Sequence, residues 1–343
     1  MRKGIRYLAV AILASVFCTA AAHSATEAMY AGKTIRIIVG FTPGGGFDIY
    51  SRTIGRHLGK HIQGNPNIIV ENMPGAGSRV SANHLYKVAR PDGLTIGHFI
   101  GSLLMDQVLG RRGIEYDAEK FEYIGAPAKD NPVCALTKAS GITTIEKWLA
   151  AKEPVKLGGS APGNTTDDYP NILRAAIGLP IHLVSGYKGT ADIRLAADSG
   201  EVAGGCWTWD SMKATWSGAI EAGNAVVILQ MLPRPDPDLP KVPLAINYAN
   251  TEQARQLIEA GIHDLNLIVR PYVLPPGTPK DRVQIMRKAF IDTFRDPEFL
   301  AEAKKSRLDI NAVSGEEIER TVAKLFKVPA PILAKLREIL EVK

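Results

Sequence analysis

The chain has 343 residues and a formal net charge of +6, and its 41 basic residues form no dense Lys/Arg stripe. A charge this mild and dispersed excludes the class of proteins that bind nucleic acid through a basic face. The length exceeds what one hydrophobic core usually serves, so two domains are expected.

Residues 1–25 are expected to be a secretory signal peptide. The chain opens with a basic segment, carries no charge from Tyr7 to Ala22, and reaches small residues at Ala20–Ala22. The apolar run is too short and too rich in alanine for a comfortable membrane anchor. Its removal takes away three basic residues and no acid, which lowers the formal net charge to +3. We therefore expect a soluble mature protein in the periplasm.

Cys134 and Cys206 are the two cysteines outside this segment, and their spacing fits no zinc or redox motif. A disulfide is permitted in an exported protein. The sequence leaves open whether the geometry allows one.

Residues 34–62 predict a strand, a glycine turn and a helix. Ile35–Val39 is the near-continuous apolar run of a parallel strand covered on both faces. From Phe47 to Ile62, apolar residues recur every three or four positions, which predicts an amphipathic helix. The turn Thr42–Gly46 holds three glycines, which permit backbone angles closed to other residues and leave N–H groups uncovered. Because such groups begin a helix, the turn predicts an anion site for a carboxylate or phosphate.

The alternation of strand and helix continues to Phe99. Strands are expected at Asn67–Glu71 and Leu94–Phe99, with a helix between them. This order predicts a parallel sheet, whose ligands bind beyond the carboxyl ends of the strands. Gly40–Gly46 and Ile100–Ser102 both lie at such ends.

Two similar units follow in the second half of the chain. Val155–Gly158 leads through the polar turn 159–168 into a helix, and Ile181–Val184 leads through Ser185–Thr190 into another. Each offers donors at a helix N-terminus. We expect the turns of the two domains to face each other.

The domain limits follow from the expected crossings. The chain should enter the second domain before Val133 and return near Leu267–Leu274, and the C-terminal helices should pack on the first domain. This gives domain 1 as 30–130 plus 268–343 and domain 2 as 131–267.

Trp207 and Trp209 follow a predicted strand at 202–206. Because side chains alternate along an extended segment, one indole is expected to face a ligand. Interdomain packing is the competing interpretation.

Several short segments form a pattern along the chain: Pro43–Gly45 with Asp48, Ser51-Arg52, Val70–Asn72, Pro74–Gly77, Pro91–Gly93, Tyr187–Thr190, Pro275–Pro279 and Asp296–Glu298. In order and spacing they resemble the tripartite tricarboxylate transporter receptors, the periplasmic TctC-like or Bug solute-binding proteins. The resemblance spans nearly the whole mature chain. It implies an α/β, two-domain periplasmic-binding-protein-like fold of type II, with a mainly parallel sheet flanked by helices in each domain and a hinge between them.

The resemblance also implies how a ligand is held. In this family two loops grip a carboxylate through backbone amides and bound water, and by position these loops are Phe41–Gly46 and Gly189–Ala191. We expect them to neutralise the carboxylate without a buried full positive charge. The candidate ligand residues are Phe41, Thr42, Pro43, Gly44, Gly45, Gly46, Asp48, Gly101, Ser160, Thr165, Tyr187, Gly189, Thr190, Ala191, Trp207 and Asp210.

Asp48 has a second interpretation, in which it stabilises the helix dipole and ties the glycine turn by hydrogen bonds. The implied partners are a di-, tri- or aromatic carboxylate and the membrane subunits of a tripartite transporter. A monomer is expected, with no catalytic residue, metal or cofactor.

Gly44-x-Gly46 with Glu71 imitates a dinucleotide fingerprint, but Ile49 stands at the third glycine position. His57 and His61 have metal-ligand spacing on a helix, but no acidic or cysteine ligand stands nearby in sequence, so a solvated face is favoured. A sensor subunit for a signalling kinase or an exported enzyme acting on carboxylates remain as functional alternatives to the transport receptor.

Overall fold

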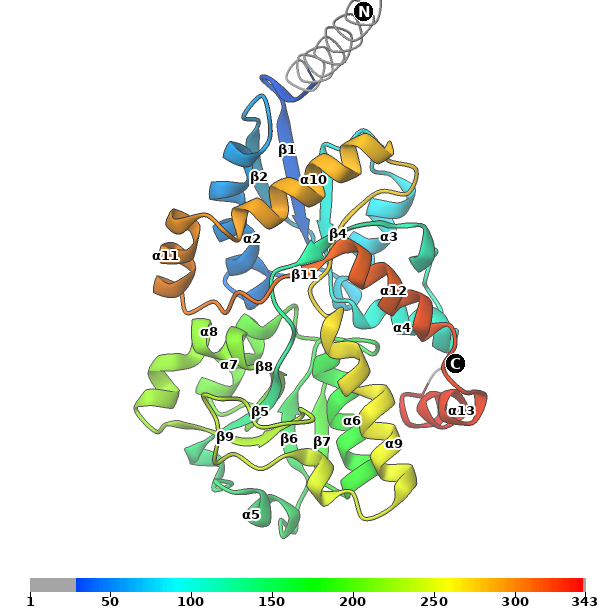
Figure 1. Cartoon of the computed structure of the whole chain (residues 1–343). Helices are drawn as coiled ribbons and strands as arrows, with labels where there is room; N and C mark the ends of the chain where they lie inside the picture. The colour runs from blue at the N-terminus through cyan, green and yellow to red at the C-terminus, as the bar shows by residue number, and fades with distance from the viewer. Residues whose placement is uncertain (1–28, 342–343) are drawn as a thin grey trace, which may run out of the picture.

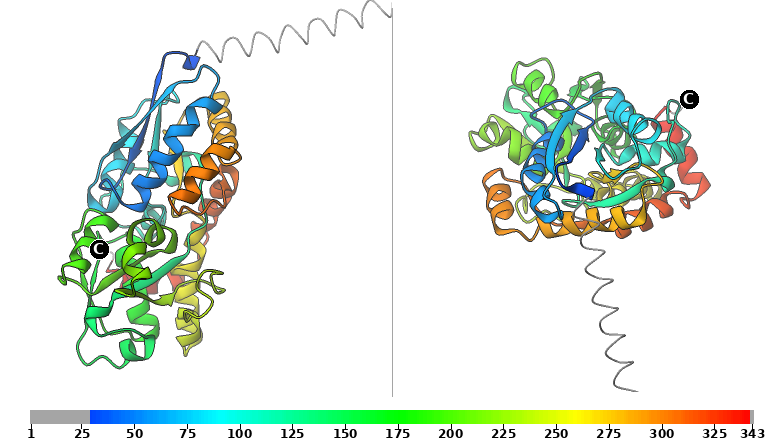
Figure 2. Two further views of the ribbon diagram at one scale, coloured as in Figure 1. Left: turned by 90° about the vertical axis from the view of Figure 1, so that its left-hand side faces the viewer. Right: turned by 90° about the horizontal axis from the view of Figure 1, so that it is seen from above.

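The computed structural model describes residues 29–341, so the expected signal peptide lies outside the described residues. Two β-sheets, each accompanied by helices, form the upper and lower halves of the molecule in Figure 1. Figure 2 shows that these halves, the first and second lobes, are stacked end to end. Among residues 29–341, every helix is too short or too polar to span a lipid bilayer.

The first lobe is built on a six-stranded sheet of order β11-β4-β10-β3-β1-β2. Its strands are β1 (Thr34–Val39), β2 (Asn67–Asn72), β3 (Thr95–His98), β4 (Glu122–Ala126), β10 (Tyr272–Leu274) and β11 (Val313–Ser314). As predicted, β1 runs parallel to β2 and β3, and its apolar residues Ile35, Ile37 and Val39 are completely buried. The helices α2 (Gly46–Leu58), α3 (Arg79–Lys87) and α4 (Ser102–Leu109) follow these strands.

The second lobe holds a five-stranded sheet of order β7-β6-β8-β5-β9. Its strands are β5 (Pro132–Thr137), β6 (Val155–Gly158), β7 (Ile181–Val184), β8 (Gly204–Thr208) and β9 (Ala225–Gln230). Its helices are α5 (Ile145–Leu149), α6 (Thr165–Ile177), α7 (Thr190–Asp198), α8 (Trp209–Glu221) and α9 (Glu252–Gly261). Short 3-10 turns occur in both lobes at η1 (Gly59–His61), η2 (Ala76–Ser78), η3 (Ala118–Lys120), η4 (Lys138–Ser140), η5 (Ala245–Tyr248) and η6 (His263–Leu267).

Both sheets are mixed, but most strands within each sheet point in the same direction, as expected of a mainly parallel sheet. In the first sheet β10 and β11 run antiparallel to their neighbours, and in the second sheet β5 runs antiparallel to β8 and β9. The cause is the path of the chain. β1 ends at the junction of the lobes, whereas β10 begins there, because the chain has just returned from the second lobe.

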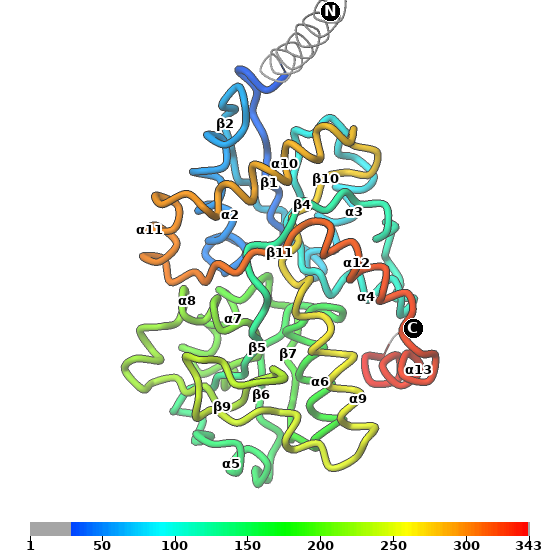
Figure 3. Tube along the Cα trace, in the orientation of Figure 1, coloured from blue at the N-terminus to red at the C-terminus, as the bar shows by residue number. Residues whose placement is uncertain are grey.

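Figure 3 traces the two connections between the lobes, from β4 to β5 and from α9 to β10. The limits expected near residues 130 and 268 fall within these connections. That they divide two domains stays a proposal.

The C-terminal region folds into α10 (Lys280–Thr293), α11 (Pro297–Lys305), α12 (Gly315–Leu325) and α13 (Ala330–Ile339). The first three contact β4 or α2 of the first lobe, as expected. For α13 the expectation holds only in part, because this helix contacts α4 of the first lobe but also α6 and α9 of the second. Its buried Leu336 lies against Gly261 of α9. An apolar stripe predicts that a helix face is buried, but not which partner buries it.

Cys134 of β5 and Cys206 of β8 are joined by a disulfide. The two residues are directly opposite each other in an antiparallel pair, with their Cα atoms 4.0 Å apart. Both side chains are completely buried. The pairing that the sequence left open is thus present.

Candidate functional site

A closed cavity of about 20 Å³ lies between the lobes. Its lining comes from both lobes and from the segment that precedes β10: Phe41, Gly45, Gly46, Phe47, Ile100, Ser160, Asn164, Thr165, Thr166, Gly189, Thr190, Trp207, Thr208, Ser211, Val269 and Arg270. A volume of this size admits about one water molecule. The lobes are therefore closed on each other in this structure.

Four helices begin at the cavity. Its lining includes the N-cap and first-turn residues of α2 and α7, and likewise of α6 and α8. Each N-terminus presents N–H groups that have no partner within the helix, together with the positive end of a helix dipole. The cavity is therefore electropositive before any side-chain charge is considered.

The four N-termini are not equivalent. Asn164 caps α6 by accepting a hydrogen bond from Thr166 N at 3.1 Å, and Thr208 caps α8 by accepting one from Ser211 N at 3.3 Å. The N-caps of α2 and α7 are Gly45 and Gly189, which have no side chain for this purpose. The two uncapped N-termini are thus the turn that the sequence predicted to hold an anion and the second loop that the resemblance implied.

These two turns also face each other, as expected. Thr42 Oγ1 donates a hydrogen bond to Asp192 Oδ2 across the lobes at 3.0 Å. A Cβ atom placed on Gly45 would lie 3.1 Å from Thr190 Oγ1, and one placed on Gly189 would lie 2.9 Å from Thr42 Oγ1. Glycine keeps the space between the turns open for a ligand atom.

The glycines of the first turn have different roles. Only Gly44 has a positive φ, of 83°, whereas Gly45 has φ −86° and ψ 170°, which any residue can adopt. A Cβ atom on Gly46 would lie 2.2 Å from Ser211 Oγ. Of the three glycines, only Gly44 therefore uses a backbone angle that is closed to most other residues. Gly45 and Gly46 permit close approach instead.

Arg270 adds a buried positive charge to the cavity wall. Its side chain is only 1% exposed, and Nε donates to Asp130 Oδ1 at 3.1 Å. Burial alone would lower the pKa of Arg270, but the charge and hydrogen bond of Asp130, together with Tyr50 and Asp210, outweigh it and raise this pKa, so the guanidinium stays charged. The expectation of a site without a buried full positive charge is wrong.

Four polar side-chain atoms in the lining have no hydrogen-bond partner among the described residues: Asn164 Nδ2, Trp207 Nε1, Ser211 Oγ and Arg270 Nη1. Each belongs to a side chain that is at most 2% exposed. All four can donate a hydrogen bond, and the lining contains no carboxylate. Since unpaired buried donors are costly, this surface is complementary to a ligand rich in acceptors.

Half of the candidate ligand residues line the cavity: Phe41, Gly45, Gly46, Ser160, Thr165, Gly189, Thr190 and Trp207. The other half lie outside its lining: Thr42, Pro43, Gly44, Asp48, Gly101, Tyr187, Ala191 and Asp210. Of these, Thr42, Pro43, Gly44 and Ala191 belong to the facing turns. Gly101 is enclosed by Ile268, whose carbonyl oxygen would lie 1.5 Å from an added Cβ atom. Tyr187 donates to Glu201 Oε1 at 2.6 Å.

Asp48 ties the first turn together. Its carboxylate accepts hydrogen bonds from Gly44 N at 2.9 Å, from Arg52 Nε at 3.0 Å and from Asn72 Nδ2 at 2.9 Å. Burial would raise the pKa of Asp48, but the bonds from Arg52 and Gly44 hold it below its ordinary value. The structural role considered for Asp48 in the sequence is confirmed.

The two tryptophans point to different places, although strand alternation would put residues 207 and 209 on the same face. The reason is that β8 ends at Thr208 and Trp209 begins α8. Trp207 lines the cavity, whereas Trp209 lines an outer groove and donates through Nε1 to Asp238 Oδ2 at 3.2 Å. Trp207 also stacks on Trp216, with ring centroids 5.6 Å apart. Of the two indoles, Trp207 therefore has access to the cavity.

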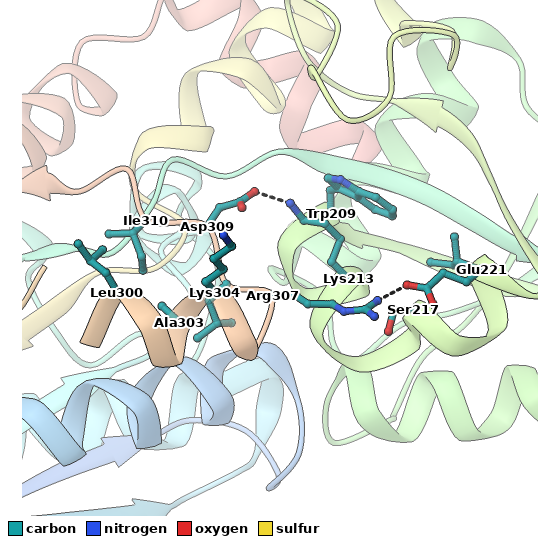
Figure 4. A pocket seen from close by; sticks show the side chains of 12 residues that line it. Trp209, Lys213, Ser217, Glu221, Leu300, Ala303, Lys304, Arg307, Asp309 and Ile310 are labelled. Carbon is teal, nitrogen blue, oxygen red and sulfur yellow. Dashed lines mark hydrogen bonds and ion pairs between the residues drawn. The ribbon is translucent and has the colours of Figure 1, made fainter. Parts of the chain in front are cut away.

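The outer groove, shown in Figure 4, has a volume of about 510 Å³ between α8 and the region 300–310. Four of its charged groups are already paired across it, because Lys213 Nζ lies 2.5 Å from Asp309 Oδ2 and Arg307 pairs with Glu221. Paired charges offer a ligand less than unpaired donors do. The smaller inner cavity is thus the better candidate site.

Sequence reasoning missed Asn164, Ser211 and Arg270 as ligand candidates. Arg270 did carry a signal, since it is a single charge within the apolar stretch from Leu267 to Leu274. A lone charge in such a stretch needs a buried partner or a function.

The histidines considered for metal binding lie against α11. His57 Nε2 is 2.7 Å from Glu302 Oε2, and His61 Nε2 is 2.9 Å from Asp296 Oδ2. Acidic groups distant in sequence are thus nearby, contrary to the argument from local sequence. His57, Asp296 and Glu298 could supply three ligand atoms to a metal, but Lys60 Nζ already lies 2.5 Å from Asp296 and 2.6 Å from Glu298. This arrangement favours an ion-pair network between α2 and α11.

Asp210 should make stability depend on pH. Burial, and then the neighbouring Asp309, raise the pKa of Asp210 from 3.8 to about 8. The folded state then binds a proton more tightly than the unfolded state, so the free energy of unfolding should fall as pH rises between these two values. Asp210→Asn should flatten this decline.

Urea unfolding of the wild-type protein and of Asp210→Asn, each at about pH 5 and about pH 8.5, gives the change of the unfolding free energy with pH in each protein. Asp309→Asn removes the neighbouring charge and should flatten the wild-type slope in part. Equal slopes in the wild-type protein and Asp210→Asn would contradict this assignment.

Comparison with known proteins gives consistent matches. The family model described as "Tripartite tricarboxylate transporter family receptor" (TctC) matches residues 52–337. A UPF0065 protein in the gbd 5' region of Cupriavidus necator is 25% identical over 309 residues, which cover 89% of this chain and 88% of that protein.

Two solved structures share the fold. The periplasmic binding protein BugD has a TM-score of 0.73 at 20% identity, and the match covers 92% of this chain and 99% of that one. MatC from Rhodopseudomonas palustris with bound malate has a TM-score of 0.69 at 17% identity, with 90% and 99% covered. The expected two-domain periplasmic-binding-protein fold is confirmed.

Proposed function

This chain belongs to the tripartite tricarboxylate transporter family of receptors, and from that premise we propose that it captures a small organic carboxylate between its lobes and delivers it to a tripartite tricarboxylate transporter. The observation that carries the proposal is the donor-rich lining of the cavity. The lining includes two uncapped helix N-termini and four residues with an unpaired side-chain donor, and it contains no carboxylate. Such a surface favours an anion.

Hinge closure is part of the proposal. A cavity of about 20 Å³ is too small for an organic acid, so entry requires the lobes to separate. The contacts that would break include polar ones, such as Thr42 with Asp192 and Ser102 Oγ with the carbonyl oxygen of Gly163 at 2.7 Å. The two connections between the lobes would absorb the motion.

The family assignment supports a periplasmic location and a transporter as partner, while malate in the similar MatC structure supports a carboxylate as ligand. The chain would act by binding alone, without turnover. Residues 1–25 would direct its export.

A thermal-shift screen tests the proposed ligand class. The panel contains dicarboxylates, tricarboxylates and aromatic acids, with nucleotides and sugars as controls. A ligand at about 100 times its Kd should raise the midpoint by roughly 5 °C, because it stabilises the folded state by about 2.7 kcal/mol. Stabilisation by nucleotides or sugars alone would overturn the carboxylate assignment.

A further inference from the structure

The guanidinium of Arg270 is held in a fixed position at the cavity wall. Nε donates to Asp130, and Nη2 donates to Thr208 Oγ1. The guanidinium carbon lies 4.9 Å from the ring centroids of both Phe47 and Tyr50. These contacts restrain every part of the group except Nη1, which has no partner among the described residues.

Nη1 has a second free donor beside it. A Cβ atom on Gly46 would lie 3.4 Å from Arg270 Nη1 and 2.2 Å from Ser211 Oγ, so both atoms flank the same glycine. Ser211 Oγ also lacks a partner, and both residues are at most 2% exposed. A guanidinium nitrogen and a hydroxyl side by side can each donate to one carboxylate.

The number of donors exceeds what one carboxylate can accept. A carboxylate has about four acceptor positions. The uncapped first turns of α2 and α7 each present at least two N–H groups, so together they can fill these positions. Arg270, Ser211, Asn164 and Trp207 then still hold free donors. A second acceptor group on the ligand would satisfy them.

The charges agree with a second anionic group. Asp130 contacts the Nε edge of Arg270, whereas Nη1 lies beside Gly46, which lines the cavity. The guanidinium would therefore separate a ligand carboxylate from Asp130 and attract both. Two negative charges on the ligand would be met by one guanidinium and by the N-termini of four helices.

We propose that Arg270, assisted by Ser211, binds a second carboxylate of the ligand, so that the site selects dicarboxylates over monocarboxylates. The inference rests on the proposed function and adds a chemical class to it. It also makes Arg270 a link between ligand and closure, because the same side chain touches α2 of the first lobe and Thr208 of the second.

The test compares succinate, butyrate and succinamate by calorimetric titration. Succinamate replaces one carboxylate of succinate by a neutral amide of nearly the same shape. The wild-type protein should bind succinate between about 10- and 150-fold more tightly than either monoanion, the range expected for hydrogen bonds to charged groups. The ratio of affinities is the readout.

The variant must not leave an unpaired buried charge. Arg270→Gln alone would strand Asp130, so the test uses Arg270→Gln together with Asp130→Asn, which removes both charges. In this double variant the preference for succinate over butyrate should fall to less than about 3-fold, while butyrate still binds. Lys213→Gln is the control, because it removes a cation at the lobe junction outside the cavity. Its affinity ratio should equal that of the wild-type protein.

A wild-type protein that binds butyrate and succinate equally would overturn the role of Arg270 and leave the carboxylate receptor standing. Equal affinities for succinamate and succinate would also overturn the role of Arg270, since Arg270 would then not distinguish a carboxylate from a neutral amide. A double variant that retains the wild-type preference for succinate over butyrate would likewise overturn the role of Arg270. If no mono-, di- or tricarboxylate bound at all, the proposed function itself would fail.

Discussion

Valine at Gly45 or Gly189 is expected to weaken carboxylate binding by more than about 100-fold, while the fold is retained. The added side chain would stand between the two facing turns, beside Thr190 Oγ1 or Thr42 Oγ1. It would exclude a ligand from the free N–H groups of α2 or α7. Losing two hydrogen bonds to a charged group costs about 3 kcal/mol or more, which corresponds to this change in Kd.

Stability should change little because neither glycine needs an unusual backbone. Gly45 has φ −86° and Gly189 has φ 173°, and both values are open to valine. The ligand-free lobes can also separate slightly to relieve contact. Unfolding midpoints of the variants without ligand should thus lie close to the wild-type value.

A graded series sharpens the test. Alanine at Gly45 adds one carbon at 3.1 Å from the Thr190 hydroxyl, which can rotate away, so its effect should be smaller than that of valine. Gly218→Val is the matched control, because a Cβ atom at Gly218 on α8 meets nothing within 4 Å. It should leave the affinity unchanged. Wild-type affinity in both Gly45→Val and Gly189→Val would reject the two-turn site.

The two facing turns could be predicted because the residues that form each of them are close together in the sequence. An apolar strand, a turn rich in glycine and a helical apolar period occupy adjacent positions in the sequence, and each unit ends at the edge where its neighbours end. The absence of capping side chains at Gly45 and Gly189 can likewise be read from the residue types. The resemblance to the receptor family pointed to the same segments.

The rest of the cavity depends on contacts between distant segments. Arg270 is buried because Asp130, 140 positions away, supplies a countercharge, and because Phe47 and Tyr50 flank its guanidinium. No local pattern contains that arrangement. The same reason explains α13, whose apolar stripe predicted burial but not its contact with α9. It also explains His57 and His61, whose acidic partners come from the region 296–302.

The mixed sheets show a further limit of local patterns. The residues of β10 are as apolar as those of a parallel strand, and all three are completely buried. Its direction is set by where the chain enters the first lobe, at the junction with the second. This direction places Arg270, just before β10, at the cavity instead of at the far edge of the sheet. Topology thus decides the position of the buried charge.

Removing the disulfide is expected to cost about 4 kcal/mol of unfolding free energy. The bond joins Cys134 to Cys206 across 72 positions of sequence, and closing a loop of this length restricts the unfolded chain by about that amount in the chain-entropy model. Cys134→Ala/Cys206→Ala should therefore lower the midpoint of thermal unfolding by roughly 10 °C. Part of the loss comes from two small buried side chains, which alanine replaces with little change of volume.

Reduction distinguishes the contribution of the disulfide to stability from the contribution of the two cysteine side chains. The wild-type protein, unfolded in urea with dithiothreitol, should show the lower unfolding free energy of the double variant, whereas dithiothreitol should leave the variant unchanged. Because the bond lies wholly between β5 and β8 of the second lobe, ligand affinity at a temperature where both proteins are folded should be the same. Equal stability of the oxidised wild-type protein and the double variant would show that the bond does not restrict the unfolded chain. A loss of affinity in a folded variant would instead show that the second lobe needs the bond to hold α7 and α8 at the cavity.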